Sequence, residues 1–146
     1  MKMHFTQPVD APPAQVFTRL DNIEGLVAEL ADDRMSLTPL EPGQWAVVLH
    51  LKDHARNGTL HLAAREVGTP YCLTGHVDGL ELTAVVSVLS DDDAGPSAMD
   101  VSLALAAHTL RSRVMLAGLT VTQGHLHTRL ASRLAAFAKR IEERDD

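Results

Sequence analysis

Eight histidines in a chain of 146 residues are the first candidates for chemistry, because imidazole is the commonest metal ligand in proteins. His125 and His127 fall in a segment with helical spacing, about 200° apart around the axis, so they cannot bind one ion. His50 and His54 flank a strand end and a turn, where Asp53 or another donor would have to complete a site. Neither Cys-x-x-Cys nor His-Glu-x-x-His is present. We therefore expect no metal and no cofactor, and scattered surface or half-buried histidines.

The only cysteine, Cys72, could act as a nucleophile if a base lay close enough to activate it. It falls on a predicted strand whose same face carries Thr74 and His76. Cys72 and His76 are four residues apart on that strand, or about 13 Å, which is too far for direct contact. We expect a buried, unreactive thiol. One cysteine also excludes an internal disulfide.

The elements that position these side chains follow an informative order. Residues 3–7 alternate like a strand, and two short helical segments follow, one beginning at Pro12-Pro13 and one running from about residue 22 to Leu30. Residues 35–105 then alternate with a period of two, broken by turn signals that include Asp53 to Gly58, Asp78-Gly79 and the acidic loop 91–96. Hairpin-length loops of this kind favour an antiparallel meander.

From about Arg113 the spacing becomes helical, with an apolar stripe that leaves Arg129 and Arg133 outside. Gly118 and Gly124 weaken the first half of this helix by about 1 kcal/mol each. The stripe consists of Leu119, Leu126, Leu130, Leu134, Phe137 and Ile141. The sequence thus predicts an α+β fold, in which one closing amphipathic helix covers the apolar face of the sheet and tends to leave a cavity beneath it.

The more apolar register of the strands predicts which face lines that cavity. Trp45 and Tyr71 are its only polar tips, and Gln123 or Thr122 from the helix could join them. Few ionisable groups fall on this face, which fits binding better than catalysis, although Trp and Tyr also occur as ordinary core residues. The full predicted face is Trp45, Val47, Leu49, Leu60, Leu62, Tyr71, Leu73, Leu82, Val86, Val101 and Leu103. The predicted ligand contacts are Trp45, Leu49, Leu62, Tyr71, Leu82, Val86, Leu103, Leu119, Gln123 and Leu126.

Composition narrows the class of protein. With 45% hydrophobic and 22% charged residues, the chain predicts one soluble domain over 1–146. Its net charge of −6 argues against a nucleic-acid or anionic-membrane partner, and basic residues at the C-terminal end fit the solvated side of the last helix. No leader and no apolar run of about 18 residues is seen. We expect a cytoplasmic protein with no stable membrane insertion, and a homodimer or a protein partner stays open.

The opening segment Phe5-Thr6-Gln7-Pro8-Val9-Asp10-Ala11-Pro12-Pro13-Ala14-Gln15-Val16-Phe17 resembles the START/Bet v 1-like (SRPBCC) superfamily, in which a first strand meets an Ala-Pro helix start. Asn57-Gly58-Thr59-Leu60 and Gly75-His76-Val77-Asp78-Gly79 are similar to the bacterial carbon-monoxide-dehydrogenase branch of that superfamily. The resemblance covers essentially the whole chain. It implies a helix-grip fold: a curved seven-stranded antiparallel sheet, two short helices after the first strand, and a long C-terminal helix over a hydrophobic cavity. It carries no shared catalytic residue.

Three hypotheses follow. The leading one is a non-enzymatic module that binds a small hydrophobic molecule, such as a lipid, isoprenoid, quinone or polyketide-like compound, between sheet and helix. The second is a cyclase, aromatase or dehydratase that uses the same cavity, with His76, His108 or Glu81 as acid or base if the strand register is off by one. The third, from the resemblance to the carbon-monoxide-dehydrogenase branch, is an accessory or assembly factor of an oxidoreductase such as carbon monoxide dehydrogenase. A membrane-tethering tail sometimes follows the domain in that branch, and here the sequence stops at Asp146, which counts against a membrane-attached role.

Overall fold

The structure, a computed structural model, describes residues 1–21, 35–50, 55–63, 70–92 and 94–143. The second short helix predicted after the first strand falls on residues outside this set. The strands are β1 Lys2–Val9, β2 Met35–Glu41, β3 Gln44–His50, β4 Ala55–Leu62, β5 Tyr71–Val77, β6 Leu80–Ser90 and β7 Ser97–Ala107. The helices are α1 Pro13–Asp21, α3 Leu110–Val121 and α4 Gln123–Glu143.

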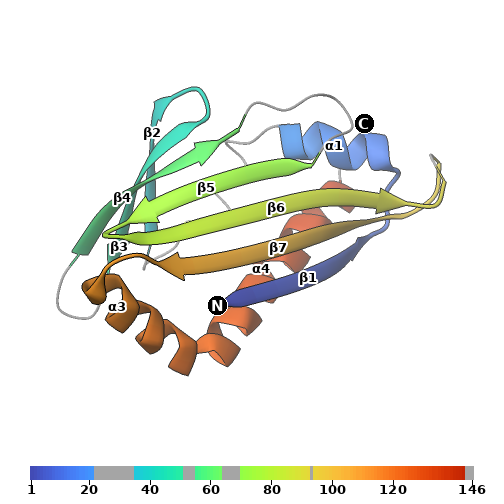
Figure 1. Cartoon of the computed structure of the whole chain (residues 1–146). Coiled ribbons are helices and arrows are strands. Elements are labelled where there is room, and N and C mark those ends of the chain that lie inside the picture. Colours follow the sequence, from blue (N-terminus) through green and yellow to red (C-terminus); the bar gives the residue numbers. More distant parts are fainter. Residues whose placement is uncertain (22–34, 51–54, 64–69, 93, 144–146) are drawn as a thin grey trace.

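Seven strands form one antiparallel sheet in the order β1-β7-β6-β5-β4-β3-β2 (Figure 1). Strands β2 to β7 are each paired with the next strand along the chain, and β1 joins by pairing with β7. Asp78-Gly79 forms the predicted hairpin turn, with φ values of 51° and 82°, as the two central positions of a type I′ turn require. The antiparallel meander predicted from the loop lengths is therefore confirmed.

Strand β4 begins earlier than its sequence suggests. Asn57-Gly58 predicts the end of a turn, but both residues lie inside β4, where Gly58 pairs with Val47 of β3 and Val77 of β5. A Cβ atom at residue 58 would lie 2.1 Å from the His76 carbonyl oxygen. Glycine is needed here because a neighbouring backbone approaches closely, and the turn prediction was wrong.

Strand β1 also runs further than predicted. Pro8 was expected to end it, but the strand continues to Val9, and Pro8 pairs with Ala98 of β7. Strand β1 forms an edge of the sheet, where a residue without an N–H group can be accommodated.

The closing helix is divided into two at Thr122. Helix α3 ends one residue before it, and α4 begins one residue after it, with the Leu126 N–H donating to the Thr122 carbonyl at 3.0 Å. Gly118 and Gly124 flank the break, and a Cβ atom on either would meet nothing within 4 Å. Neither glycine makes room for a neighbour, so their contribution to the break is low helix propensity.

Helix α1 begins at Pro13, as the Pro12-Pro13 signal predicts. The Pro12 carbonyl accepts the N–H groups of Gln15 at 3.0 Å and Val16 at 3.3 Å. Val16 and Leu20 are buried. The Gln15 side chain donates to the Ile141 carbonyl at 2.6 Å, which ties α1 to the last turns of α4.

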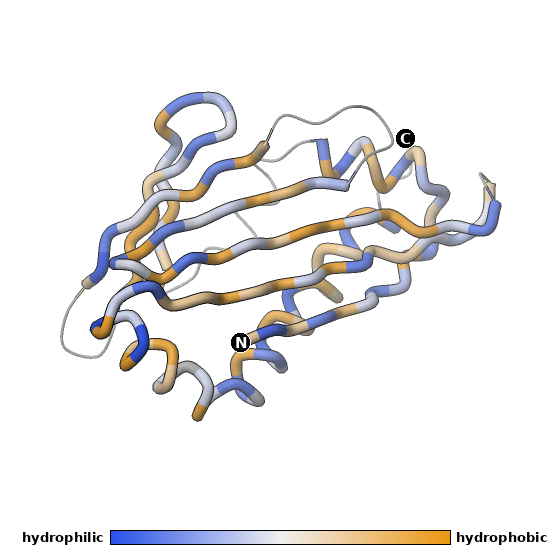
Figure 2. Tube along the Cα trace, in the orientation of Figure 1, coloured by the Kyte–Doolittle hydropathy of each residue, from blue (hydrophilic) through white to orange (hydrophobic). Residues whose placement is uncertain are grey.

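The helices cover one half of the sheet's inner face. We call the buried cluster there the helix-packed core, because α1 and α4 pack onto β1, β7 and β6; Leu126, Leu130 and Leu134 of the predicted α4 stripe lie against it, half-buried. Apolar residues recur along the strands and also in α3 (Figure 2). The helix-packed core consists of Met3, Phe5, Val9, Ala11, Val16, Leu20, Tyr71, Val86, Met99, Val101, Phe137, Ala138 and Ile141.

Candidate functional site

The strand register places the whole predicted apolar face on one side of the sheet. Trp45 pairs with Leu60, Leu62 with Leu73, and the same row continues across β6 and β7. Val86 and Val101 of this face belong to the helix-packed core, so the face is the inner one, toward α4. The register deduced from alternation is therefore confirmed.

A second buried cluster lies on the half of this face formed by β3, β4, β5 and β6. We call it the inner cluster: Trp45, Val47, Leu60, Leu73 and Ala84. The half-buried residues packed against it are Met35, Leu37, Leu49, Leu62 and Leu103, all of them on strands. Within the described part of the chain, no helix residue joins the inner cluster. It is a continuous apolar surface whose described neighbours are all strand residues.

Tyr71 lies where the two clusters meet. Its ring is buried, at 3% exposure, and its hydroxyl group donates to the carboxylate of Asp21 at the end of α1, at 2.5 Å. The Phe17 ring lies 6.5 Å from the Tyr71 ring, centroid to centroid. The predicted polar tip is thus present, and a carboxylate already engages it.

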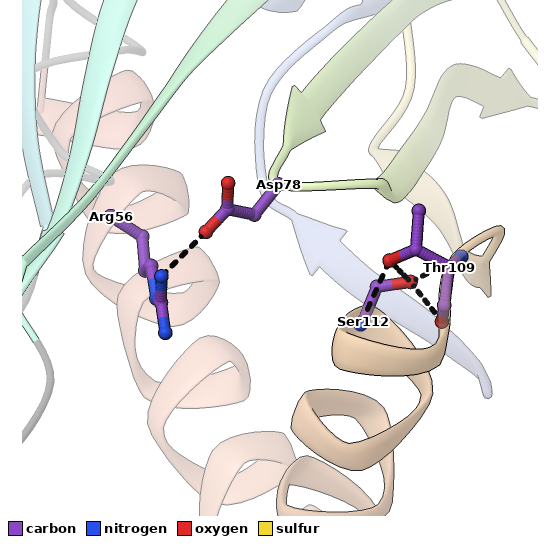
Figure 3. A network of polar contacts seen from close by, with 4 residues as sticks. All are labelled: Arg56, Asp78, Thr109 and Ser112. Atoms are coloured by element: carbon purple, nitrogen blue, oxygen red, sulfur yellow. Dashed lines mark hydrogen bonds and ion pairs between the residues drawn. The ribbon is translucent and has the colours of Figure 1, made fainter.

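Arg56 places a cation at the opposite end of the inner face, where sequence reasoning had predicted a turn. It pairs with Leu49 in the sheet, and its Nη1 donates to Asp78 Oδ2 at 2.8 Å (Figure 3). Its Nε atom is buried and has no hydrogen-bond partner. The alternation of Arg56, Gly58, Leu60 and Leu62 was the signal that could have found it.

The other predicted ligand contacts are distributed over both clusters. Leu82 is half-buried on the inner face, and Leu126 packs against the helix-packed core. The Gln123 amide donates to the Lys2 carbonyl at 3.3 Å, at the β1 edge of the sheet. Leu119 lies in α3, and its side chain is outside the described residues. Trp45, Leu49, Leu62 and Leu103 are the contacts that the structure brings together in and around the inner cluster.

Solved structures share this arrangement over nearly the full length. The Zhui aromatase/cyclase from Streptomyces sp. R1128 has a TM-score of 0.63 at 12% identity, covering 96% of this chain and 94% of its own. The chain has the helix-grip fold. Norcoclaurine synthase from Thalictrum flavum, a Bet v 1-like protein, has a TM-score of 0.67 at 10% identity, covering 99% of this chain and 95% of its own.

A third likeness is to Ara h 8.0201, with a TM-score of 0.56 at 15% identity and 99% coverage of both chains. The sequence matches no family model and no curated protein. The likenesses therefore establish the helix-grip fold of Bet v 1-like proteins, and they do not distinguish the carbon-monoxide-dehydrogenase branch within it.

Glu81, His76 and His108, the acid or base candidates of the cyclase hypothesis, lie outside the helix-grip interior. Glu81 pairs with His76 across β5 and β6, in the row that faces away from α4. Its Oε2 lies 3.8 Å from His76 Nδ1 and 3.9 Å from His108 Nε2, and both imidazoles are about 60% exposed. The register is not off by one, so these three residues do not face the proposed cavity.

The remaining histidines and Cys72 also have structural surroundings. His4 bonds to Asp100 at 2.6 Å, His50 to the Ser36 hydroxyl at 3.0 Å, and the His127 ring stacks on Phe5. Cys72 is half-buried on the outer face, rather than fully buried as predicted. Asp53 and His54, the proposed partners of His50, lie outside the described residues. Within the described ranges, no three His, Cys, Asp or Glu side chains come together as a metal site needs.

Helix α4 carries an open hollow on its flank. Arg129 and Arg133 line it and are half-buried, whereas the sequence predicted that both would be solvated. The hollow has a volume of about 430 Å³, and its described lining is Thr128, Arg129, Ser132, Arg133 and Ala136. Among the described helices of this fold, none is long and apolar enough to cross a membrane.

Proposed function

We propose that the protein binds a small hydrophobic molecule on the inner face of the sheet, beside the inner cluster. The observation that carries this proposal is the asymmetry of the face: one half packs against α1 and α4, and the other half has only strand residues among its described neighbours. Apolar surface removed from water contributes about 25 cal/mol per Å² to binding. A lipid, isoprenoid, quinone or polyketide-like compound would satisfy that requirement.

Arg56 narrows the chemistry of this ligand. A buried N–H donor without a partner costs about 1–3 kcal/mol, which a ligand oxygen would recover. The Nε atom of Arg56 is such a donor, on the inner face at the end next to Asp78. We therefore favour an amphipathic molecule with an acceptor oxygen at one end over a pure hydrocarbon. The Tyr71 hydroxyl, already donated to Asp21, is less available to orient it.

The single tryptophan, Trp45, reports on binding directly because it belongs to the inner cluster. Excitation of Trp45 should transfer energy to bound 1-anilinonaphthalene-8-sulfonate, and an apolar competitor should abolish the transfer. Ala84→Phe fills the inner face and should reduce probe affinity at least tenfold, an effect of about 1.4 kcal/mol. Thr83→Phe, one residue away on the outer face, is the matched control.

Native mass spectrometry of protein purified from its host gives an independent readout. An apolar molecule should leave with the wild-type protein and be absent from Ala84→Phe. Ala84→Leu serves if the phenylalanine variant does not fold. Equal probe binding by the Ala84 and Thr83 variants would overturn the proposal.

The Tyr71–Asp21 pair favours an enzyme of the cyclase type as the second candidate. A phenol that donates to a carboxylate at 2.5 Å beside an apolar face is a group that could transfer a proton. Turnover of a linear polyketide mimic should then fall by about 10²–10⁴-fold in Tyr71→Phe, with probe binding preserved. His76→Gln, on the outer face, should leave turnover unchanged. The accessory role suggested by the carbon-monoxide-dehydrogenase resemblance gains no contact in the structure, and we do not pursue it.

A further inference from the structure

Helix α3 exposes apolar side chains that a globular protein normally covers. Leu110 is 79% exposed, Val114 68% and Val121 86%. These are three of the five large apolar residues that the described surface exposes in this way. Ala117 is also exposed. Apolar residues concentrated on one short helix, rather than scattered singly, indicate an interaction surface.

The spacing of these residues places them on one stripe. Leu110, Val114, Ala117 and Val121 follow each other at steps of four, three and four, so they fall within about 60° of arc on the helix. Arg111 and Arg113 are exposed on either side of this stripe, about 60° from its edges. Ser112, fully buried, and the half-buried Met115 and Leu116 occupy the opposite side. The exposed side of α3 is therefore an apolar stripe with an arginine on each flank.

The fold holds this stripe outward. The Thr109 N–H donates to Ser112 Oγ at 2.9 Å, and the Ser112 N–H donates to Thr109 Oγ1 at 3.0 Å, a reciprocal cap at the start of α3 (Figure 3). The His108 N–H donates to the Gly79 carbonyl at 3.0 Å. A Cβ atom on Gly79 would lie 2.7 Å from the Thr109 side chain. Because the cap is packed against the β5–β6 hairpin, α3 cannot turn about its axis to bury the stripe without losing these contacts.

Charge identifies the partner. From Ala107 to Arg140 the chain has six Lys and Arg residues and no Asp or Glu, although the whole chain carries a net charge of −6. The net charge used to argue against an anionic membrane thus conceals a basic C-terminal segment. An exposed apolar stripe between arginines is typical of a helix that lies in the interface of an anionic bilayer, where long basic side chains reach the headgroups.

A second copy of the chain fits this surface poorly. A helix of 12 residues is about 18 Å long, and a stripe of three large side chains and an alanine falls well short of the ~800 Å² per partner that stable dimers bury. Pairing two α3 helices would also bring their arginines together with no carboxylate on either helix.

We propose that α3 docks the protein on an anionic lipid bilayer, with Leu110, Val114 and Val121 at the acyl boundary and Arg111 and Arg113 at the headgroups. The surface lies next to the Arg56 end of the inner face, since Arg56 bonds to Asp78 and the next residue, Gly79, contacts Thr109 (Figure 3). Docking there would hold the inner face at the membrane from which an apolar ligand is taken. The docking itself does not depend on the proposed ligand.

Vesicle sedimentation tests the docking. We expect the protein to bind phosphatidylcholine vesicles that contain phosphatidylserine, to bind pure phosphatidylcholine vesicles more weakly, and to dissociate as salt screens the headgroups. Leu110→Ser/Val121→Ser should weaken partitioning at least tenfold. Arg111→Gln and Arg113→Gln should each weaken it about fivefold on phosphatidylserine vesicles only. All four positions are exposed, so circular dichroism should match the wild type.

Leu40→Ser is the matched control, because Leu40 is 57% exposed on β2, outside α3. It should sediment like the wild type. The proposal is overturned if wild type does not bind phosphatidylserine vesicles, or if Leu40→Ser loses as much binding as the α3 variant. It is equally overturned if light scattering shows a dimer that Leu110→Ser/Val121→Ser dissociates. Probe binding to the inner face, measured separately with Trp45, distinguishes a failure of docking from a failure of the ligand proposal.

Discussion

The two halves of the inner face are built from the same kinds of residue and are covered differently. On the β1–β7–β6 half, Phe137 and Ile141 of α4 and Val16 and Leu20 of α1 fill the space above the strands. On the other half, Trp45 and its neighbours contact strand residues alone among those described. The comparison separates two tasks: the helix-packed core stabilises the fold, and the inner cluster is left available for a ligand. Substitutions on each side test this separation.

The largest effect should come from Ile141→Ala. Ile141 is fully buried between α1, α4 and the sheet, and large-to-small changes at such sites cost about 2–5 kcal/mol. Leu60→Ala, in the inner cluster, should cost about 2 kcal/mol, at the low end, because fewer packed neighbours lose contact. Urea denaturation of both variants measures the difference. Equal losses would mean that the inner cluster is an ordinary core.

Removal of the α3 cap should have a smaller effect. Thr109→Ala loses the oxygen that accepts the Ser112 N–H and should reduce the free energy of unfolding by about 1 kcal/mol. Thr122→Ala, at the junction of α3 and α4, is the control, since its hydroxyl contact to the Gly118 carbonyl is long, at 3.4 Å. If α3 is independent of the inner face, Trp45 energy transfer will not change in Thr109→Ala. A large change would join the two regions.

Tyr71→Phe probes the boundary between the halves. The substitution keeps the ring in the helix-packed core and removes the hydrogen bond to Asp21, whose exposure to water limits the cost to about 1 kcal/mol. We expect probe affinity to change less than twofold, an effect under about 0.5 kcal/mol. Thermal denaturation and probe titration measure the two quantities. A much larger loss of affinity would place Tyr71 among the ligand contacts.

The smallest effect on stability should come from Arg56→Met. The ion pair of Arg56 with Asp78 is partly exposed, at 23% and 36% for the two side chains, and such pairs contribute about 0–1 kcal/mol. Affinity should respond more than stability does: a fatty acid should bind several-fold more weakly, and an alkane of equal length should not. Identical losses for both compounds would remove the polar anchor from the proposal.

Much of this fold was predictable because alternation is a local property. The inner face from Trp45 to Leu103 follows from a period of two, and pairing to the next strand follows from short loops. Gly58 was misread because turn and close approach call for the same residue, and only the position of the β5 backbone distinguishes them. Arg56 was missed with it. The stripe on α3 was also missed, because the sequence assigned the whole segment after Arg113 to one helix with one buried side.

Pro8, which β1 includes, has a counterpart at the far end of the sheet. Pro39 lies in β2, so each of the two edge strands carries one proline, and the five strands between them carry none in the described residues. An open sheet has two rows of unpaired backbone groups that can pair with another molecule, and a proline interrupts such a row. A protein that collects at a membrane surface reaches high local concentrations. These two prolines oppose edge-to-edge polymerisation under those conditions.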